Sequence, residues 1–138
     1  MKKNINFKKI LRSAKLKKTT PRIAILKVLS KTKHPETTQE IYKKLKKTGI
    51  DLTTLYRTLA SFEKSGLVRK VDLHKDTIYY ESNLSHHHHI ICTKCNKIED
   101  FENLEIEKVL KQIIKKSSKF KDIKNHSLEL FGFCRGCA

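Results

Sequence analysis

Apolar residues recur at helical spacing early in the chain, where they predict two helices in succession. The second helix carries its apolar residues in the range 25–29. Thr20 and Pro21 are expected to open it as N-cap and first helical residue, and Pro35 after His34 is expected to stop it, because a residue before proline avoids the helical conformation. The first helix has an apolar face made of Phe7, Ile10, Leu11 and Ala14.

A third and a fourth helix are predicted next, with a turn at Gly49 between them. Residues 37–40 form a threonine-to-glutamate capping box that opens the third helix, and Gly49 closes it. The fourth helix runs from about Leu52 to Ser65 and leaves Thr53 on the face opposite its apolar stripe, with Tyr56 beside the stripe. The stripe consists of Leu52, Leu55, Leu59 and Phe62.

Two short strands follow the fourth helix. Gly66 ends the helix, and the ranges 67–71 and 77–81 read as strands joined through His74, Lys75 and Asp76. Helices, a tight turn, a further helix and a hairpin together predict a winged helix-turn-helix, whose 52–65 helix enters the major groove of DNA.

The pattern changes character at Ser82. Short apolar strands are expected around 90–91, 98–101 and 128–133, with one periodic helix capped by Asn103 between the last two. The fold class is therefore α+β, with a winged-helix DNA-binding domain at 1–81 and a small α/β dimerisation domain at 82–138. Three strands and one helix make a thin core, which favours a bound metal and a homodimer. The helix repeats Ile106, Val109, Leu110, Ile113 and Ile114.

The charge is distributed unevenly along the 138 residues, whose formal net charge is +17. Residues 1–81 hold 21 lysines and arginines against 7 acidic residues, whereas residues 82–138 hold 10 against 7. A positive surface concentrated in one domain favours binding to a polyanion, and double-stranded DNA fits the predicted fold. A lysine-rich solvated surface is the alternative, but it does not explain the asymmetry.

The four cysteines form two pairs with the spacing Cys-x-x-Cys. Cys92 and Cys95 make the first pair, and Cys134 and Cys137 make the second. Two such pairs complete a closed tetrahedral Zn(II) shell with no position for water, which is the pattern of a structural site. A redox dithiol or a labile disulfide is the alternative interpretation.

Four consecutive histidines, His86 to His89, lead into the first cysteine pair. In an extended segment His86 and His88 point to one side and His87 and His89 to the other, so they cannot all bind one ion. Two separate sites are indicated, and mixed nitrogen and oxygen ligands suit exchangeable Fe, Mn, Zn or Ni. The side chains available to complete them are Glu81, Asp100, Glu107, His34 and His126.

These motifs resemble the ferric uptake regulator family of metal-sensing bacterial repressors. The resemblance runs from about Leu16 to Cys137 and rests on four segments in the same order and spacing. They are Thr54 to Leu59, His86 to His89, Ile91 to Lys97, and Asn125 to Leu128 before the last cysteine pair. The chain departs from the family at His88, where many relatives have aspartate or an aromatic residue, and at Asn96, where glycine is usual.

The resemblance implies a role for each candidate residue. Structural zinc would be bound by Cys92, Cys95, Cys134 and Cys137. The regulatory metal would be bound by His34, Glu81, His87, His89 and Asp100. A further metal site would use His86, His88, Glu107 and His126. DNA contacts are expected from Lys17, Thr53, Thr54, Tyr56 and Arg57.

The function that follows is a metal-responsive repressor of metal-ion homeostasis. A divalent metal, Fe(II) or Zn(II)/Mn(II), is expected to close the hinge of a homodimer and so enable binding to double-stranded operator DNA. A peroxide-sensing regulator of the same family is one alternative, disfavoured because Glu81 stands where those relatives commonly have aspartate. A metal storage or buffering protein is the other.

Other classes of protein find little support. The chain has no nucleophile elbow, no His-Glu-x-x-His helix and no phosphate loop, so we expect that it is not an enzyme. The range 1–12 is basic and has no apolar core of the length that a secretion signal requires, and no apolar run is long enough for a membrane span. We therefore expect a cytoplasmic protein with no membrane partner.

Overall fold

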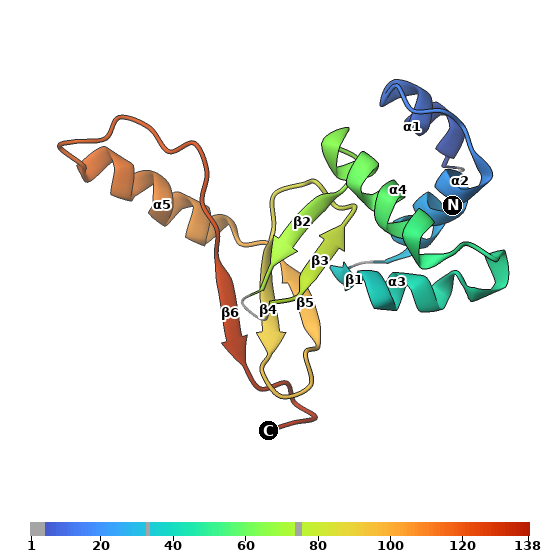
Figure 1. Ribbon diagram of the computed structural model, residues 1–138. Helices are drawn as coiled ribbons and strands as arrows, with labels where there is room; N and C mark the ends of the chain where they lie inside the picture. The colour runs from blue at the N-terminus through green and yellow to red at the C-terminus, as the bar shows by residue number, and fades with distance from the viewer. Residues whose placement is uncertain (1–4, 33, 74–75) are drawn as a thin grey trace. The chain divides into compact units, whose positions relative to one another are not determined.

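The computed structural model describes residues 5–32, 34–73 and 76–138 and divides the chain into two compact units, Met1–Leu84 and Ser85–Ala138 (Figure 1). The division falls three residues after the boundary expected from the sequence. Each unit has its own three-stranded sheet. None of the helices in the described part of the chain has the length and apolarity of a membrane span.

The first unit contains the helices and the hairpin of a winged helix-turn-helix, so this part of the predicted α+β fold is confirmed. Strand β3 lies at the centre of its sheet and pairs antiparallel with β1 on one side and β2 on the other. In chain order the elements are α1 (Phe7–Ser13), α2 (Thr20–Lys31), β1 (Glu36–Thr37), α3 (Thr38–Lys44), the 3-10 turn η1 (Lys46–Thr48), α4 (Leu52–Lys64), β2 (Arg69–Asp72) and β3 (Ile78–Glu81).

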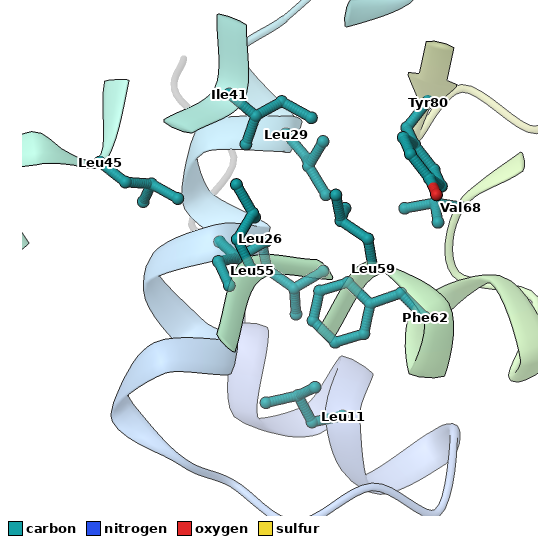
Figure 2. Close-up of a cluster of buried hydrophobic side chains, with 11 residues drawn as sticks. Leu11, Leu26, Leu29, Ile41, Leu45, Leu55, Leu59, Phe62, Val68 and Tyr80 are labelled. Atoms are coloured by element: carbon teal, nitrogen blue, oxygen red, sulfur yellow. The ribbon is translucent and has the colours of Figure 1, made fainter. Parts of the chain in front are cut away.

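One buried cluster holds these elements together, and Figure 2 shows side chains from all four helices converging on it. Three members of the predicted α4 stripe, Leu55, Leu59 and Phe62, have no exposed surface. Burying large aliphatic and aromatic side chains in this way contributes the main favourable term in folding. The full cluster is Leu11, Ile25, Leu26, Leu29, Ile41, Leu45, Leu55, Leu59, Phe62, Val68 and Tyr80.

Helix boundaries differ from the sequence expectations at two points. The N-cap of α2 is Thr19, whose hydroxyl accepts the Arg22 N–H, so Thr20 is the first helical residue instead of the cap. Helix α3 ends at Lys44, and the chain continues as a 3-10 turn before Gly49 stops it with a left-handed φ of 73°. The capping box of α3 is confirmed. His74 and Lys75 of the expected hairpin turn lie outside the described residues.

The second unit has a sheet in the order β5-β4-β6. Strands β4 and β5 are antiparallel, whereas β6 pairs parallel with β4 after the chain has passed through α5. Its elements are β4 (His88–Cys92), β5 (Ile98–Phe101), α5 (Leu104–Lys116) and β6 (Glu129–Gly132). Asn103 caps α5 by accepting the N–H groups of Glu105 and Ile106, as the sequence predicted.

Helix α5 projects from the sheet and has no buried residue (Figure 1). Its apolar stripe is open, with Val109 53% and Ile113 57% exposed. A strongly amphipathic helix normally covers its apolar face. The stripe therefore has the character of a surface that a second chain covers.

Candidate metal centres and DNA-binding surface

The parallel pairing of β4 and β6 brings the two cysteine pairs to the same end of the sheet. Cys92 is the last residue of β4 and is in register with Gly132, the last residue of β6. The turn after Cys92 is closed by the Asn96 N–H, which donates to the Cys92 carbonyl over 2.9 Å. Asn96 has a φ of 64°, a conformation that asparagine tolerates better than most residues, so it serves where glycine is usual.

The cysteine cluster fits a tetrahedral zinc ion. The four Sγ atoms lie within 4.8 Å of one another, and none of the four cysteines forms a disulfide. The distance from Cys95 Sγ to Cys134 Sγ is 3.7 Å. A tetrahedron with Zn–S bonds of about 2.3 Å places its sulfurs about 3.8 Å apart.

The thiols of this cluster are not equally acidic. Backbone N–H groups at Cys134 and Cys95 hydrogen bond to the Cys92 sulfur and lower its pKa to about 6. Hydrogen bonds with the Cys134 and Cys95 sulfurs raise the pKa of Cys137 to about 12. Because zinc binds thiolates, completing the shell must release protons.

A second cluster lies at the other end of β4, on one face of the sheet. His87 Nε2 is 3.1 Å from His89 Nε2, and the Asp100 carboxylate oxygens lie 3.8 Å from the first and 3.5 Å from the second. This arrangement follows from strand geometry. His87 and His89 are two residues apart, so their side chains point to the same side, and Asp100 is in register with His89. Both histidines are buried. Two imidazole nitrogens and a carboxylate converging in this way are a ligand set for a divalent transition metal.

The two remaining residues expected at that regulatory site belong to the first unit. Glu81, the last residue of β3, is only 3% exposed, and its Oε1 accepts two hydrogen bonds from the Arg69 guanidinium. His34 is exposed and lies just before β1, with its Nδ1 3.1 Å from the Pro35 carbonyl. Their participation in a shared site with the second unit stays a prediction.

A third cluster lies on the opposite side of β4. His86 Nε2 and His88 Nε2 are 2.7 Å and 2.8 Å from Glu107 Oε1, and His126 Nε2 is 3.5 Å from the same oxygen. Hydrogen bonds from His88 and His86 lower the pKa of Glu107 to about 2. Nε2 of His126 is buried with no hydrogen-bond partner among the described residues. It lies close to three other atoms that can bind a metal, an arrangement that fits a bound cation. The four histidines are thus divided between the two faces of the sheet, as the sequence predicted.

Three of the five residues expected to contact DNA lie on the open face of α4. Thr53, Tyr56 and Arg57 are exposed there, and Tyr56 exposes 48% of its surface. Thr54 is half-buried at the start of the helix, where its N–H donates to the Asp51 carboxylate over 2.7 Å. This arrangement presents one helix turn of polar and cationic side chains beyond the packed core, as a recognition helix does.

Lys17 lies in the loop between α1 and α2, with its side chain exposed. Its carbonyl accepts a hydrogen bond from the Arg22 guanidinium over 3.0 Å, which fixes the backbone of the loop to the first turn of α2. Lys17 is thus an exposed basic residue of the first unit.

Comparisons with known proteins agree over almost the whole chain. The model of the ferric uptake regulator family matches residues 13–131. The ferric uptake regulation protein of Legionella pneumophila is 36% identical over 131 residues, covering 92% of this chain and 95% of the relative. The crystal structure of the Vibrio cholerae ferric uptake regulator superposes with a TM-score of 0.81 at 34% identity and covers 94% of this chain and 100% of that one.

A third similarity concerns metal sites in particular. The Helicobacter pylori ferric uptake regulator, whose structure reveals three functional metal binding sites, has a TM-score of 0.81 at 26% identity, with 99% of this chain and 97% of that chain covered.

These matches define the class of protein: it is a metal-responsive DNA-binding regulator of transcription. The chain belongs to the ferric uptake regulator family, as its motifs indicated. Members of that family are dimeric, metal-dependent repressors. Zinc at a cysteine cluster together with a second, regulatory divalent metal is the cofactor content that goes with this membership.

One residue beside the candidate site was not identified from the sequence. Arg69, the first residue of β2, is the direct register partner of Glu81 and binds its carboxylate. The signal existed, because two strands joined by a hairpin pair their outer ends, and counting back from the hairpin turn would have placed Arg69 opposite Glu81.

Proposed function

We propose that the cluster of His87, His89 and Asp100 is the regulatory metal site of this repressor. The observation that carries the proposal is the approach of two buried imidazole nitrogens and one carboxylate to within 3.8 Å of one another on one sheet face. The His87 Nδ1 lies 2.6 Å from the Ser85 carbonyl, which orients the ring so that its Nε2 faces the Nε2 of His89. His89 and Asp100 are held by strand pairing and His87 lies directly before β4, so the set is preorganised.

His34 and Glu81 would complete the shell from the first unit. The bound ion would supply positive charge, which the carboxylates would neutralise. The ligands of the second unit alone would not fill its coordination shell. Ligands drawn from both units then restrict how the DNA-binding unit moves relative to its neighbour. The chain's own contribution is to place His34 just before β1 and Glu81 at the end of β3, two strands that contact α3, while the Ser82 hydroxyl donates to the Leu29 carbonyl of α2.

We further propose that operator DNA is bound by the first unit and that the second unit forms the dimer. The exposed face of α4 would read base edges with Thr53, Tyr56 and Arg57, while Lys17 would neutralise a phosphate. The open stripe of α5 would pack against the partner copy. If dimer, metal and DNA are linked in this way, metal and DNA raise each other's affinity by the same factor.

The metal assignment follows from ligand chemistry. Four thiolates suit structural Zn(II), whereas imidazole and carboxylate ligands suit exchangeable Fe(II), Mn(II) or Zn(II). Fe(II), or Zn(II)/Mn(II), is the effector we propose for the His87 cluster. The cluster of His86, His88, Glu107 and His126 would be an additional divalent site. The protein would work in the cytoplasm, where its DNA is, and we expect no enzymatic activity.

The test is operator binding by the purified zinc-loaded dimer, titrated separately with Fe(II), Mn(II), Zn(II) and Ni(II) at fixed salt. One metal should tighten sequence-specific binding by about tenfold or more, which is about 1.4 kcal/mol of coupling. His87→Ala should remove this response while the dimer and its zinc persist. A response that survives in His87→Ala would exclude this cluster, and metal binding with no effect on DNA affinity would favour storage.

A further inference from the structure

The hairpin of the first unit pairs a cation with the carboxylate that we assign to the regulatory site. Arg69 and Glu81 face each other directly across β2 and β3. The Nε of Arg69 donates to Glu81 Oε1 over 2.9 Å, and one terminal nitrogen donates to the same oxygen over 2.7 Å. Because strand register sets these neighbours, the two side chains stay next to each other in any conformation that keeps the β2–β3 ladder.

The two members of the pair differ in exposure. The Glu81 side chain is 2% exposed and the Arg69 side chain is 45% exposed. A buried carboxylate is costly unless an opposite charge and hydrogen bonds accompany it. Arg69 supplies both from the solvent side of the sheet.

A further contact fixes the guanidinium in this position. Its terminal nitrogen also donates to the Asn83 carbonyl over 3.3 Å, two residues beyond Glu81. Arg69 therefore spans the last residue of β3 and the segment that leads toward His86. Both of its hydrogen bonds to Glu81 end on Oε1, so a cation approaching the other side of the carboxylate meets an oxygen whose charge is already shared.

We propose that Arg69 sets the metal affinity of the regulatory site by competing with the divalent cation for the charge of Glu81. The inference rests on the proposed function, in which Glu81 is a ligand. A guanidinium next to a ligand repels the incoming cation and weakens the carboxylate as a donor, since like charges at short range oppose each other. The result is a site whose affinity is held below what its ligands alone would give, so that the ion is released when its free concentration falls.

A hydrogen bond to a ligand has a second effect of opposite sign, because it orients the carboxylate and raises metal affinity. Arg69→Gln separates the two effects, since glutamine keeps an N–H donor and removes the charge. Arg69→Lys keeps the charge and loses the planar fork. Lys70→Gln is the matched control: Lys70 is the next residue of β2, its side chain is 46% exposed, and it pairs with Glu63 instead.

The experiment measures Mn(II) affinity by direct titration of the zinc-loaded full-length protein, with electron paramagnetic resonance of free Mn(II) as the readout. A His126→Ala background in every sample weakens the Glu107 cluster, so one class of site dominates. Arg69→Gln should tighten Mn(II) binding by about tenfold or more, Arg69→Lys should change it by less than about threefold, and Lys70→Gln should leave it unchanged. Thermal unfolding of each variant shows that it is folded.

Weaker or unchanged Mn(II) binding by Arg69→Gln would overturn the inference, as would an equal gain in Lys70→Gln. Glu81→Gln distinguishes this failure from that of the proposed function. If Glu81→Gln weakens Mn(II) binding but Arg69→Gln does not strengthen it, only the role of Arg69 fails. If Glu81→Gln binds Mn(II) as the parent does, Glu81 is not a ligand, and both proposals about Glu81 fall together. In the double variant Arg69→Gln/Glu81→Gln, the gain in Mn(II) affinity that Arg69→Gln gives alone should disappear.

Discussion

His89 and Asp100 are direct partners across β4 and β5, and His89 Nε2 lies 3.5 Å from Asp100 Oδ1. The strand register holds the carboxylate beside both His89 and His87 before any ion binds. The loss of this one group therefore removes a ligand without disturbing the position of the other two.

Asp100→Asn should lower the affinity for the regulatory metal by about tenfold or more, about 1.4 kcal/mol, because the amide keeps the shape of the side chain and loses its charge. Metal titration of the zinc-loaded protein measures the change. Glu99→Gln is the control, since Glu99 is the exposed neighbour on the other face of β5. Equal affinities for Asp100→Asn and the parent would remove Asp100 from the site.

The zinc cluster should determine whether the second unit is folded. Cys95→Ser breaks the shell, and structural zinc contributes about 10–16 kcal/mol of apparent binding free energy in small domains, which exceeds what a thin three-stranded core supplies. The variant should lose its zinc, measured by elemental analysis, and the unfolding transition of the second unit. Lys94→Ala in the same exposed turn should keep both.

The tyrosines separate the two units in that measurement. All four, Tyr42, Tyr56, Tyr79 and Tyr80, lie in the first unit, and the chain has no tryptophan. Tyrosine near-ultraviolet circular dichroism therefore reports the first unit alone. Its transition should be retained in Cys95→Ser, and its loss together with the zinc would show that the units do not fold independently.

Much of the fold followed from periodicity, because both α4 and α5 have apolar positions that recur every three or four residues. The cysteine cluster followed from spacing, and the two histidine clusters followed from the alternation of a strand. Each of these signals is local: it is set by neighbours within a few positions along the chain.

Features that depend on pairing between distant segments were missed. Strand β1 has only two residues, Glu36 and Thr37, and exists through its ladder to Tyr80 and Tyr79. The parallel pairing of β6 with β4 could not be read from either strand, since an apolar strand carries no mark of its partner's direction. The counter-charge at Glu81 was also missed, although counting back from the hairpin turn would have placed Arg69 opposite Glu81.

The open stripe of α5 should control dimerisation. Ile113→Asp places a charge in the middle of the stripe, where burial against a partner would strongly disfavour it. The dimer dissociation constant, measured by analytical ultracentrifugation, should rise by about a hundredfold or more, about 2.7 kcal/mol. Gln112→Asp adds the same charge on the flank of the helix and should change it little. A dimer unaffected by Ile113→Asp would mean that the partner binds elsewhere.

The N-cap of α4, Asp51, should make the stability of the first unit depend on pH in the acid range. The Thr54 hydroxyl and N–H donate to the Asp51 carboxylate and hold its pKa below the usual value. A depressed pKa gives stability that is present above the unfolded value near 3.8 and is lost as pH falls through the lower folded value. Asn is an equally good N-cap but does not titrate. At neutral pH the parent should therefore have a higher melting temperature than Asp51→Asn, measured by the tyrosine signal, and the difference should shrink as the pH falls below 3.8. A constant difference would contradict this.

Tyr56 and Lys17 should affect DNA binding in different ways, because one lies on the exposed face of α4 and the other in the basic loop before α2. Lys17→Ala should weaken binding to every sequence alike and reduce the slope of log affinity against log salt by about 1, as the loss of one phosphate contact does. Tyr56→Ala should leave that slope unchanged and reduce the preference for operator over random DNA, by about 1–3 kcal/mol if it reads a base. Both are measured by fluorescence anisotropy with metal-loaded protein over a range of salt concentrations. If Tyr56→Ala changes only the salt slope, the exposed face of α4 binds the backbone and another element reads the sequence.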